Sequence, residues 1–349
     1  MAARPRIKDV ARYAGVSEKT VSNVINDYQH VSDRTRQAVR EAIDALGYRV
    51  NLAGRQLRTG RTGTVALAVP ELDVAYFSEL AKHVVEAAEE RSWTVLVHQT
   101  GARPERESAA LRGFESDFVD GVLLSPLSLR PKDLAAADVR VPLVLLGEQE
   151  IPGLGDHVGI DNVAAAREAT AHLLAAGRRR IAVVGGDTSP EAAATERLRT
   201  EGYQQALAAA GLPFDPGLLV PVEEFHWRDG ATATAALVRR RERPDALLCL
   251  NDHLAIGALR ALHEAGLSTP REVSVVGFDD IQAADFTIPS LTTVAPDKPA
   301  LARTAVDLLA HRIEAGAEQA GPPALRRVGH RLVVRESSVP PPGGDGREG

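Results

Sequence analysis

Three polar side chains, Glu18, Lys19 and Asn23, lie close together in a short run near the start of the chain. Helical spacing over residues 18–25 turns these side chains outward and places the apolar ones on the opposite face: Val21, Val24 and Ile25. Lysine can donate to guanine acceptors, asparagine can pair with adenine, and glutamate can accept from the N4 amino group of cytosine. The run therefore predicts a helix whose exposed face can read base edges in the major groove of DNA.

Such a reading helix must be held by neighbouring helices, and the flanking sequence predicts two of them. Residues 7–14 repeat apolar side chains at helical spacing, and the Gly-Val-Ser run at 15–17 then forms a turn that ends in a helix-capping serine. Ser32 can cap a third helix that stops at Gly47 and carries one apolar stripe: Val39, Ile43 and Leu46. Three short helices of this kind close a minimal core.

The charge of the chain is unevenly distributed. The full chain carries −6, whereas residues 1–61 hold 12 Lys and Arg against 6 Asp and Glu, a balance of +6. The remainder therefore carries −12. A basic N-terminal segment on an acidic body is typical of a DNA-binding protein whose larger part does not seek phosphate. The alternative is that Glu18, Lys19 and Asn23 are only solvated helix residues, but this asymmetry favours DNA binding.

From Thr64 onward, short apolar runs alternate with amphipathic helical patterns, for example at residues 77–91, 164–176 and 254–265. The apolar runs are expected to be buried parallel strands: residues 65–69, 95–97, 121–124, 143–146, 181–184, 247–250 and 273–276. This alternation predicts two doubly wound α/β lobes. Ligands of such folds bind at the carboxyl ends of the strands and in the cleft between lobes, so we expect a small-molecule site there.

Composition and motifs disfavour several functional classes. The single cysteine, Cys249, lies in an apolar run and is expected to be a small core residue, which fits a reducing compartment. The chain shows no apolar signal segment and no stretch long enough to span a membrane, so we expect a cytoplasmic protein without membrane contact. Walker-type phosphate loops, metal-ligand spacing among the 10 histidines and nucleophile elbows are missing from the sequence. We therefore expect no catalytic residue, no metal site and no cofactor.

Residues 7–26, IKDVARYAGVSEKTVSNVIN, closely resemble the helix-turn-helix signature of the lactose-repressor (LacI/GalR) family. Four further segments carry the resemblance along nearly the whole chain: residues 51–57, 158–162, 176–182 and 276–280. The resemblance implies an all-α helix-turn-helix head of the lambda-repressor type and an α/β two-lobed body similar to periplasmic sugar-binding proteins. It also implies a homodimer that reads a near-palindromic operator in double-stranded DNA.

The resemblance assigns DNA contacts position by position. Glu18, Lys19 and Asn23 look like the major-groove readers, and three hydroxyl side chains are available to phosphates: Ser17, Thr20 and Ser22. A hinge helix carries Asn51, Ala53 and Leu57, of which Leu57 matches the leucine that the family wedges into the minor groove. Alternatively, Leu57 packs on its own lobe. Gly54 departs from the family's common alanine, and a glycine inside a helix costs about 1 kcal/mol, so hinge folding is expected to be weaker.

The resemblance also points to an effector site. Arg199 matches the family arginine that grips effector hydroxyls or a carboxylate, and Asp279 matches the aspartate that accepts from ligand hydroxyls. Asn251 and Asp252 follow a strand in the same way as Asp279. Ser125 and several rings are further candidates, although the rings could belong to the core: Phe77, Phe225 and Trp227. This set suggests a sugar or related polyol, but Gly147 stands where some relatives place an aspartate, so lactose-like specificity is not expected.

The domain boundaries that follow are residues 1–50 for the DNA-binding head and 51–62 for the hinge and linker. The N-terminal lobe is expected to comprise residues 63–161 and 292–323, the C-terminal lobe residues 162–291 and 324–338, and a Pro/Gly-rich tail residues 339–349. We predict a dimeric repressor of carbohydrate-metabolism genes that a small-molecule effector releases from DNA. The alternative is a solute-binding protein for transport, which the basic head and the lack of a signal segment disfavour.

Overall fold

The computed structural model describes residues 5–25, 28–48, 61–115, 118–129, 139, 141–151, 153–189, 192–316 and 321–339. The chain divides into two compact units, residues 1–62 and 63–349, and each is described by itself. The predicted hinge residues Asn51, Ala53 and Leu57 and the tail from residue 340 lie outside the described residues.

The described part of the first unit consists of three helices: α1 (Ile7–Ala14), α2 (Glu18–Ile25) and α3 (Asp33–Leu46). Their apolar faces meet in a small core of Val10, Ala11, Val21, Val24, Val39 and Ala42. Gly15 and Gly47 end α1 and α3 with φ angles of 66° and 60°, which a glycine adopts without the steric cost of a Cβ atom. Ser32 accepts a hydrogen bond from the N–H of Thr35, which caps α3 as the sequence predicts.

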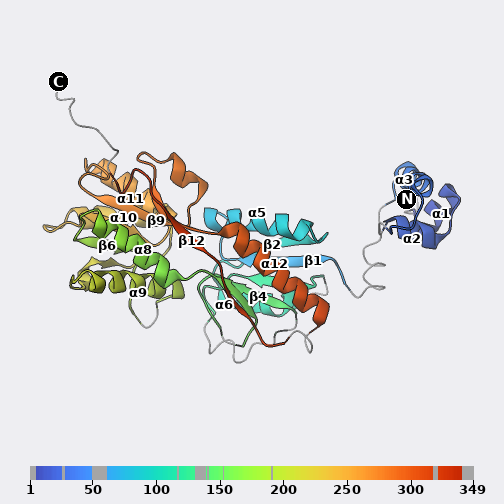
Figure 1. The fold of residues 1–349 in the computed structure, drawn as a ribbon, viewed down its shortest axis with the longest axis horizontal. Coiled ribbons are helices and arrows are strands. Elements are labelled where there is room, and N and C mark those ends of the chain that lie inside the picture. Colours follow the sequence, from blue (N-terminus) through green and yellow to red (C-terminus); the bar gives the residue numbers. More distant parts are fainter. Residues whose placement is uncertain are drawn as a thin grey trace, which may run out of the picture. The chain divides into compact units, whose positions relative to one another are not determined.

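The second unit contains two sheets, each with six strands among the described residues. The sheet of the first lobe has the strand order β11-β5-β4-β3-β1-β2. Its strands are β1 (Thr64–Val69), β2 (Thr94–Gln99), β3 (Gly121–Leu124), β4 (Leu143–Leu146), β5 (Asp156–Gly159) and β11 (Leu325–Arg327). Helices α5 (Ala75–Glu89) and α12 (Lys298–Ala315) pack side by side on one face (Figure 1), whereas α6 (Pro104–Leu111) packs on the other, followed by the 3-10 turn η1 (Gly113–Glu115).

The sheet of the second lobe has the order β12-β10-β9-β8-β6-β7. Its strands are β6 (Ile181–Val184), β7 (Leu219–Val220), β8 (Ala246–Cys249), β9 (Ser274–Phe278), β10 (Thr292–Pro296) and β12 (His330–Val333). Its α-helices are α8 (Asn162–Ala175), α9 (Ala194–Ala209), α10 (Trp227–Val238) and α11 (Asp252–Glu264), and its 3-10 turns are η2 (Pro216–Leu218) and η3 (Gln282–Phe286). Helices cover both faces, so the predicted doubly wound architecture is confirmed, except that the edge strand β12 runs antiparallel to β10.

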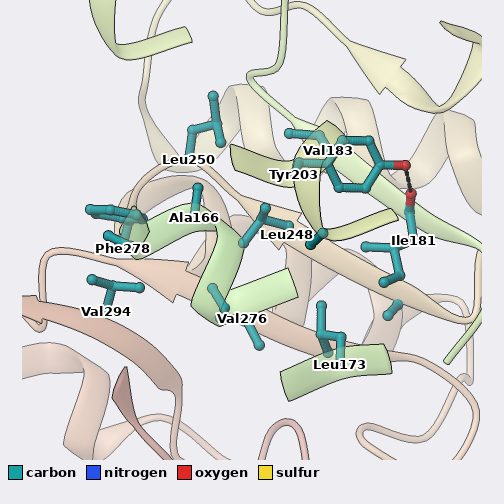
Figure 2. Packing of buried hydrophobic residues seen from close by; sticks show 14 of the residues in the cluster. Ala166, Leu173, Ile181, Val183, Tyr203, Leu248, Leu250, Val276, Phe278 and Val294 are labelled. Atoms are coloured by element: carbon teal, nitrogen blue, oxygen red, sulfur yellow. Dashed lines mark hydrogen bonds between the residues drawn. The ribbon is translucent and has the colours of Figure 1, made fainter. Parts of the chain in front are cut away.

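The core of the second lobe shows how the strands are held. Residues of α8 and α9 pack against alternate side chains of the sheet, including Leu173 and Tyr203 against Ile181 and Leu248 (Figure 2). The hydroxyl of the fully buried Tyr203 donates a hydrogen bond of 2.9 Å to the carbonyl of Ile181. This bond satisfies the one polar atom that the ring brings into the core.

The chain crosses between the lobes at positions other than those expected from the sequence. Strand β10 belongs to the second lobe because it pairs with β9, although residues 292–323 were assigned to the first. Strand β11 belongs to the first lobe because it pairs with β5, although residues 324–338 were assigned to the second. Neither strand has the continuous apolar run that marks the buried strands. The sheet that each strand joins could therefore not be inferred from the apolar pattern of the sequence.

Candidate functional site

The exposed face of α2 carries the side chains that the sequence nominated for DNA contact. Val21 and Val24 are buried, whereas Ser17, Glu18 and Lys19 are exposed and a half-buried group completes the face: Thr20, Ser22 and Asn23. The Ser17 hydroxyl accepts the N–H of Thr20 at 3.1 Å, which caps the start of the helix. Glu18 and Lys19 therefore lie in the first turn, with their charges in solvent.

The second unit has a pocket between its two lobes. From the first lobe it is lined by Tyr76, Gly147, Glu148, Gly159, Ile160 and Leu301, and from the second by Asn162, Arg199, Asp279 and Pro296. Half of these residues end or directly follow strands β4, β5, β9 and β10. The pocket therefore lies where a doubly wound fold gathers its binding groups, at the carboxyl ends of strands.

Arg199 is the most extensively bonded side chain of the pocket. On α9 and only 4% exposed, it donates from Nε to Asn162 Oδ1 at 2.9 Å and from Nη2 to Glu148 Oε1 at 2.8 Å. Nη1 donates to the carbonyl of Leu250, and the Cζ atom lies 3.6 Å from the ring centroid of Phe278. A guanidinium has five N–H donors, so its plane is fixed while two donors remain for a ligand.

Asp279 is the second predicted pocket residue that the structure places in the lining. Its φ of 112° is unusual for a residue with a side chain, and its N–H donates to the carbonyl of Val294 at 2.8 Å. No described residue forms a hydrogen bond to its carboxylate. Burial raises the pKa of this carboxyl to about 7, although the cations of Arg199 and Lys298 act in the opposite direction. The chain thus keeps an unpaired acceptor in the pocket.

The turn that carries Asp279 is secured from the first lobe. Lys298 Nζ, at the start of α12, donates to the carbonyls of Asp279 and Asp280 at 2.8 and 3.0 Å. The same Nζ lies 2.5 Å from Oε2 of Glu79 on α5, whose Oε1 accepts the N–H of Gln282 at 2.8 Å. A backbone conformation of this kind persists where its surroundings over-determine it. Lys298 and Glu79 supply that support.

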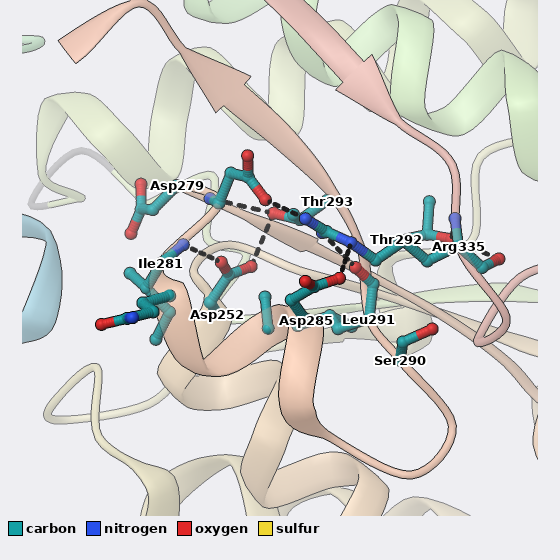
Figure 3. Close-up of polar contacts among 12 residues, drawn as sticks. Asp252, Asp279, Ile281, Asp285, Ser290, Leu291, Thr292, Thr293 and Arg335 are labelled. Atoms are coloured by element: carbon teal, nitrogen blue, oxygen red, sulfur yellow. Dashed lines mark hydrogen bonds and ion pairs between the residues drawn. The ribbon is translucent and has the colours of Figure 1, made fainter. Parts of the chain in front are cut away.

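Asn251 and Asp252 do not line the pocket. Asn251 caps α11: its Oδ1 accepts the N–H of Leu254 at 2.8 Å, and its Nδ2 donates to the carbonyl of Phe225 at 2.9 Å. The Asp252 side chain is fully buried and accepts from Ile281 and Thr293 (Figure 3), and burial raises its pKa well above the usual value. Both residues therefore brace the loops around the pocket.

The remaining candidates are not among the residues that line the pocket. Phe77 and Phe225 are half-buried against the hydrophobic cores of the first and second lobes. Trp227 is 55% exposed and packs on the His253 ring, with 4.9 Å between centroids. Ser125 is buried, and its Oγ would lie 3.6 Å from a Cβ atom on Gly147, so it supports the wall beside that glycine.

Two lining residues, Tyr76 and Glu148, were missed by sequence reasoning. Tyr76 occupies the second position of α5, next to the nominated Phe77, and one residue along a helix turns the side chain by about 100°. Burial, with the nearby Glu148 and Asp279 carboxylates, raises the pKa of Tyr76 well above its usual value, so its hydroxyl keeps its proton. Glu148 is the second residue after β4, and that position at the carboxyl end of a strand was the available signal.

Among the described residues, no group of three or more His, Cys, Asp and Glu side chains could hold a metal ion. None of the described helices is long and apolar enough to cross a membrane. Cys249 is buried in the core of the second lobe, as the sequence predicts, and burial raises the pKa of its thiol.

Two family models match the chain. Residues 6–51 match the model of bacterial regulatory proteins of the lacI family, and residues 170–338 match a periplasmic binding protein-like domain. The chain is 37% identical to the transcriptional regulator CelR of Thermobifida fusca, over 96% of this chain and 98% of that protein. It is 33% identical to the ribose operon repressor of Escherichia coli K12, over 88% and 92%. The transcriptional repressor PurR of Haemophilus influenzae strain PittEE is 32% identical over 95% and 98%.

Solved structures agree with these relatives. A putative lacI-family regulator from Sanguibacter keddieii is 47% identical, with a TM-score of 0.74 over 80% of this chain and 99% of that one. A complex of CelR with cellobiose is 33% identical, with a TM-score of 0.69 over 96% and 100%. The lac repressor dimer bound to operator and an anti-inducer is 27% identical, with a TM-score of 0.82 over 97% and 100%. The chain therefore belongs to the lacI family of DNA-binding transcriptional regulators.

Proposed function

We propose that this regulator is a homodimeric repressor of carbohydrate-metabolism genes that binds a near-palindromic operator and leaves it when a sugar or related polyol occupies the pocket. It acts in the cytoplasm, where its DNA target lies, and by binding rather than by catalysis. The observation that carries the proposal is that Arg199 and an Asp279 carboxylate without a hydrogen-bond partner line one pocket, on a chain that also presents the exposed α2 face.

In this proposal, helix α2 reads the operator. Glu18, Lys19 and Asn23 read base edges, and the hydroxyls of Ser17, Thr20 and Ser22 bond to phosphates. Asn51 and Ala53 extend the contacts through the hinge, and Leu57 enters the minor groove. The solute-transport alternative is not favoured, because the relatives that match nearly the full chain are named as transcriptional repressors and regulators.

The chemistry of the pocket suits hydroxyl groups. Asp279 can accept from them, Arg199 retains donors for them, and Tyr76 adds a ring and a protonated hydroxyl. The names of two similar proteins refer to sugars, ribose in one and cellobiose in the other. These features support a sugar or polyol as effector.

Dimer formation is supported by apolar side chains that the described residues leave in solvent. Leu96 and Val97 are 48% and 41% exposed on β2, an edge strand of the first sheet. Phe286 and Ile288, in and after η3 of the second lobe, are 77% and 97% exposed. Exposed edge strands can pair with another chain and exposed apolar side chains can pack against one, and one similar structure is a repressor dimer.

Effector release requires the two lobes to move relative to each other. The pocket holds no more than about 240 Å³ of empty space, below the usual range of roughly 300–1,000 Å³ for small-molecule sites. Several bonds join the lobes directly, among them Glu79 to Gln282 and the N–H of Ala75 to His253 Nε2 at 3.3 Å. A ligand that opens the pocket must rearrange these bonds. The angle between the two lobes then changes, and this change is transmitted to the DNA-binding heads.

The direct test is a footprint of the purified protein on DNA flanking its own gene, at two salt concentrations because phosphate contacts make binding salt-dependent. We expect a symmetric protected site that weakens at high salt and disappears when an effector sugar is added. Light scattering at micromolar concentration should give a dimer. Absence of any protected site at low salt, or a sugar that tightens operator binding, would contradict the proposal.

A further inference from the structure

We propose that Glu148 is a specificity-determining residue: it occupies Arg199 from within the chain, so the pocket accepts polyhydroxy ligands without an anionic group and rejects sugar acids and sugar phosphates. The inference rests on the proposed function of the pocket as an effector site, and it narrows the effector class. Glu148 matters because an arginine in a sugar pocket can otherwise bind a carboxylate or phosphate as strongly as hydroxyls.

The position of Glu148 is built into the backbone. It follows Gly147, which adopts a φ of 99° at the end of β4 and donates its N–H to the carbonyl of Val158 at 3.0 Å. A Cβ atom on Gly159 would lie only 2.4 Å from the carbonyl oxygen of Gly147, so the ends of β4 and β5 are in close contact. The backbone that leads into Glu148 therefore has little freedom.

The ion pair between Glu148 and Arg199 is largely removed from solvent. Nη2 of Arg199 lies 2.8 Å from Oε1 of Glu148, with side-chain exposures of 5% and 18%. The guanidinium is simultaneously held by Asn162 and by the carbonyl of Leu250, so it cannot turn away to meet an anion elsewhere. An anionic ligand would have to displace Glu148 or bind beside it.

The charge of the pocket opposes such a ligand. Its lining contains two carboxylates, Glu148 and Asp279, and one cation, Arg199. Lys298, the next cation, is engaged with Glu79 and with the carbonyls of Asp279 and Asp280. An added anion would bring further negative charge next to a cation that Glu148 already neutralises, and like charges at short range disfavour binding.

An uncharged polyol meets no such conflict. Oε2 of Glu148 and both Asp279 oxygens accept no hydrogen bond from a described residue, while Arg199 retains two donors. Neighbouring hydroxyls can donate to the carboxylates and accept from the guanidinium without separating the ion pair. The ion pair of Glu148 and Arg199 therefore offers a diol both an acceptor, from the carboxylate, and a donor, from the guanidinium.

The test measures binding of two anions, inorganic phosphate and D-glucuronate, to the full chain without DNA by calorimetry. We expect Glu148→Gln to bind at least one of these anions at least about tenfold more tightly than the wild type does. A tenfold change corresponds to the lower end of the coupling energies of close charge pairs. Glu150→Gln removes the same charge from a residue that pairs with Arg327 and does not line the pocket, so it should show no gain. Adding Arg199→Met to Glu148→Gln should abolish the gain, which excludes anion binding at the basic head.

Thermal unfolding of each variant verifies that it is folded, and Glu148→Ala serves as a second variant if the glutamine form is unstable. The proposal would be overturned if neither Glu148 variant bound either anion more tightly than the wild-type protein does, that is, if the wild type and the variants bound the anions with equal affinity. This result leaves the operator footprint unaffected. Failure of this inference is therefore distinguishable from failure of the proposed function.

Discussion

The hydroxyl of Thr293 donates a hydrogen bond of 2.6 Å to Oδ1 of Asp252, and both side chains are fully buried. The other carboxylate oxygen, Oδ2, accepts the N–H of Ile281 at 2.9 Å (Figure 3). These bonds join the start of α11 to β10 and to the segment that follows Asp279. Asp252 is thus a buried acid that positions the turn after Asp279 through Ile281, without lining the pocket itself.

Replacing Asp252 by alanine should destabilise the second unit by roughly 2–4 kcal/mol, because two buried donors lose their acceptor. Thr293→Val, which removes the hydroxyl and leaves the carboxylate, should cost about 1–2 kcal/mol, whereas Thr293→Ser should cost less because it keeps the donor. Urea unfolding measures all three variants. Equal stability of the alanine variant and the wild type would show that Asp252 does not brace the turn.

The raised pKa of Asp279 predicts a pH-dependent stability. With a folded pKa of about 7 against the usual 3.8, the folded state binds this proton more tightly. The stabilisation is fully present below about pH 4, is lost as the pH rises towards 7, and changes little above that. Asp279→Asn cannot ionise, so its free energy of unfolding should rise relative to the wild type between pH 4 and pH 8.

The comparison with Asp279→Asn is needed because Asp252, whose pKa is also raised, changes stability in the same direction. Parallel unfolding curves for the asparagine variant and the wild type over this range would contradict the assignment. The expected gain at pH 8 also means that this carboxylate is retained at a cost in stability, as ligand-binding groups often are.

The pattern of apolar runs predicted strands such as β3 and β8, because these consist of consecutive apolar residues that only a fully covered parallel sheet can bury. It was wrong about the burial of residues 95–97, which form a strand but lie half-buried or exposed at the edge of the first sheet. Strand β5 is equally buried but reads Asp-His-Val-Gly, and its aspartate, Asp156, is satisfied by Arg312 of α12 at 2.7 and 2.8 Å. Such a strand depends on a partner far away in the sequence. No local pattern reveals it.

The residues that line the pocket were also only partly predictable from the sequence. Arg199 and Asp279 line it as the resemblance implied, since both match family positions. Glu148 and Tyr76 could not be chosen from the sequence, because their roles depend on the approach of the two lobes. Asn251 and Asp252 occupy the expected strand end, but their hydrogen bonds turn inward to the loops, and only side-chain geometry distinguishes the two outcomes.

The bond network of Lys298 predicts a coupling between the lobes. Lys298→Met leaves the Glu79 carboxylate without its cation and the carbonyls of Asp279 and Asp280 without a donor, so we expect a loss of roughly 3 kcal/mol. Glu79→Gln alone should cost less, because its amide oxygen can still accept from Gln282. In a double-mutant cycle measured by urea unfolding, the two changes should interact by about 1–3 kcal/mol. Strict additivity would show that the ion pair contributes nothing.

Two lysines of the DNA-binding head allow base reading to be separated from simple charge attraction. Lys19 and Lys8 are both exposed lysines, on α2 and α1 respectively, so replacing either by alanine removes the same charge. Lys19→Ala should weaken binding to the footprinted operator by about 1–3 kcal/mol and relax base preference at one position of each half-site, because a guanine contact is lost.

Lys8→Ala should instead leave the ratio of operator to non-specific affinity nearly unchanged, since any loss of general phosphate attraction weakens both. Competition binding at two salt concentrations, with the operator and with a site mutated at single positions, measures both quantities. If Lys19→Ala changed operator and non-specific binding by the same factor, Lys19 would be a phosphate contact or a solvated residue, and Asn23 and Glu18 would have to carry the sequence reading.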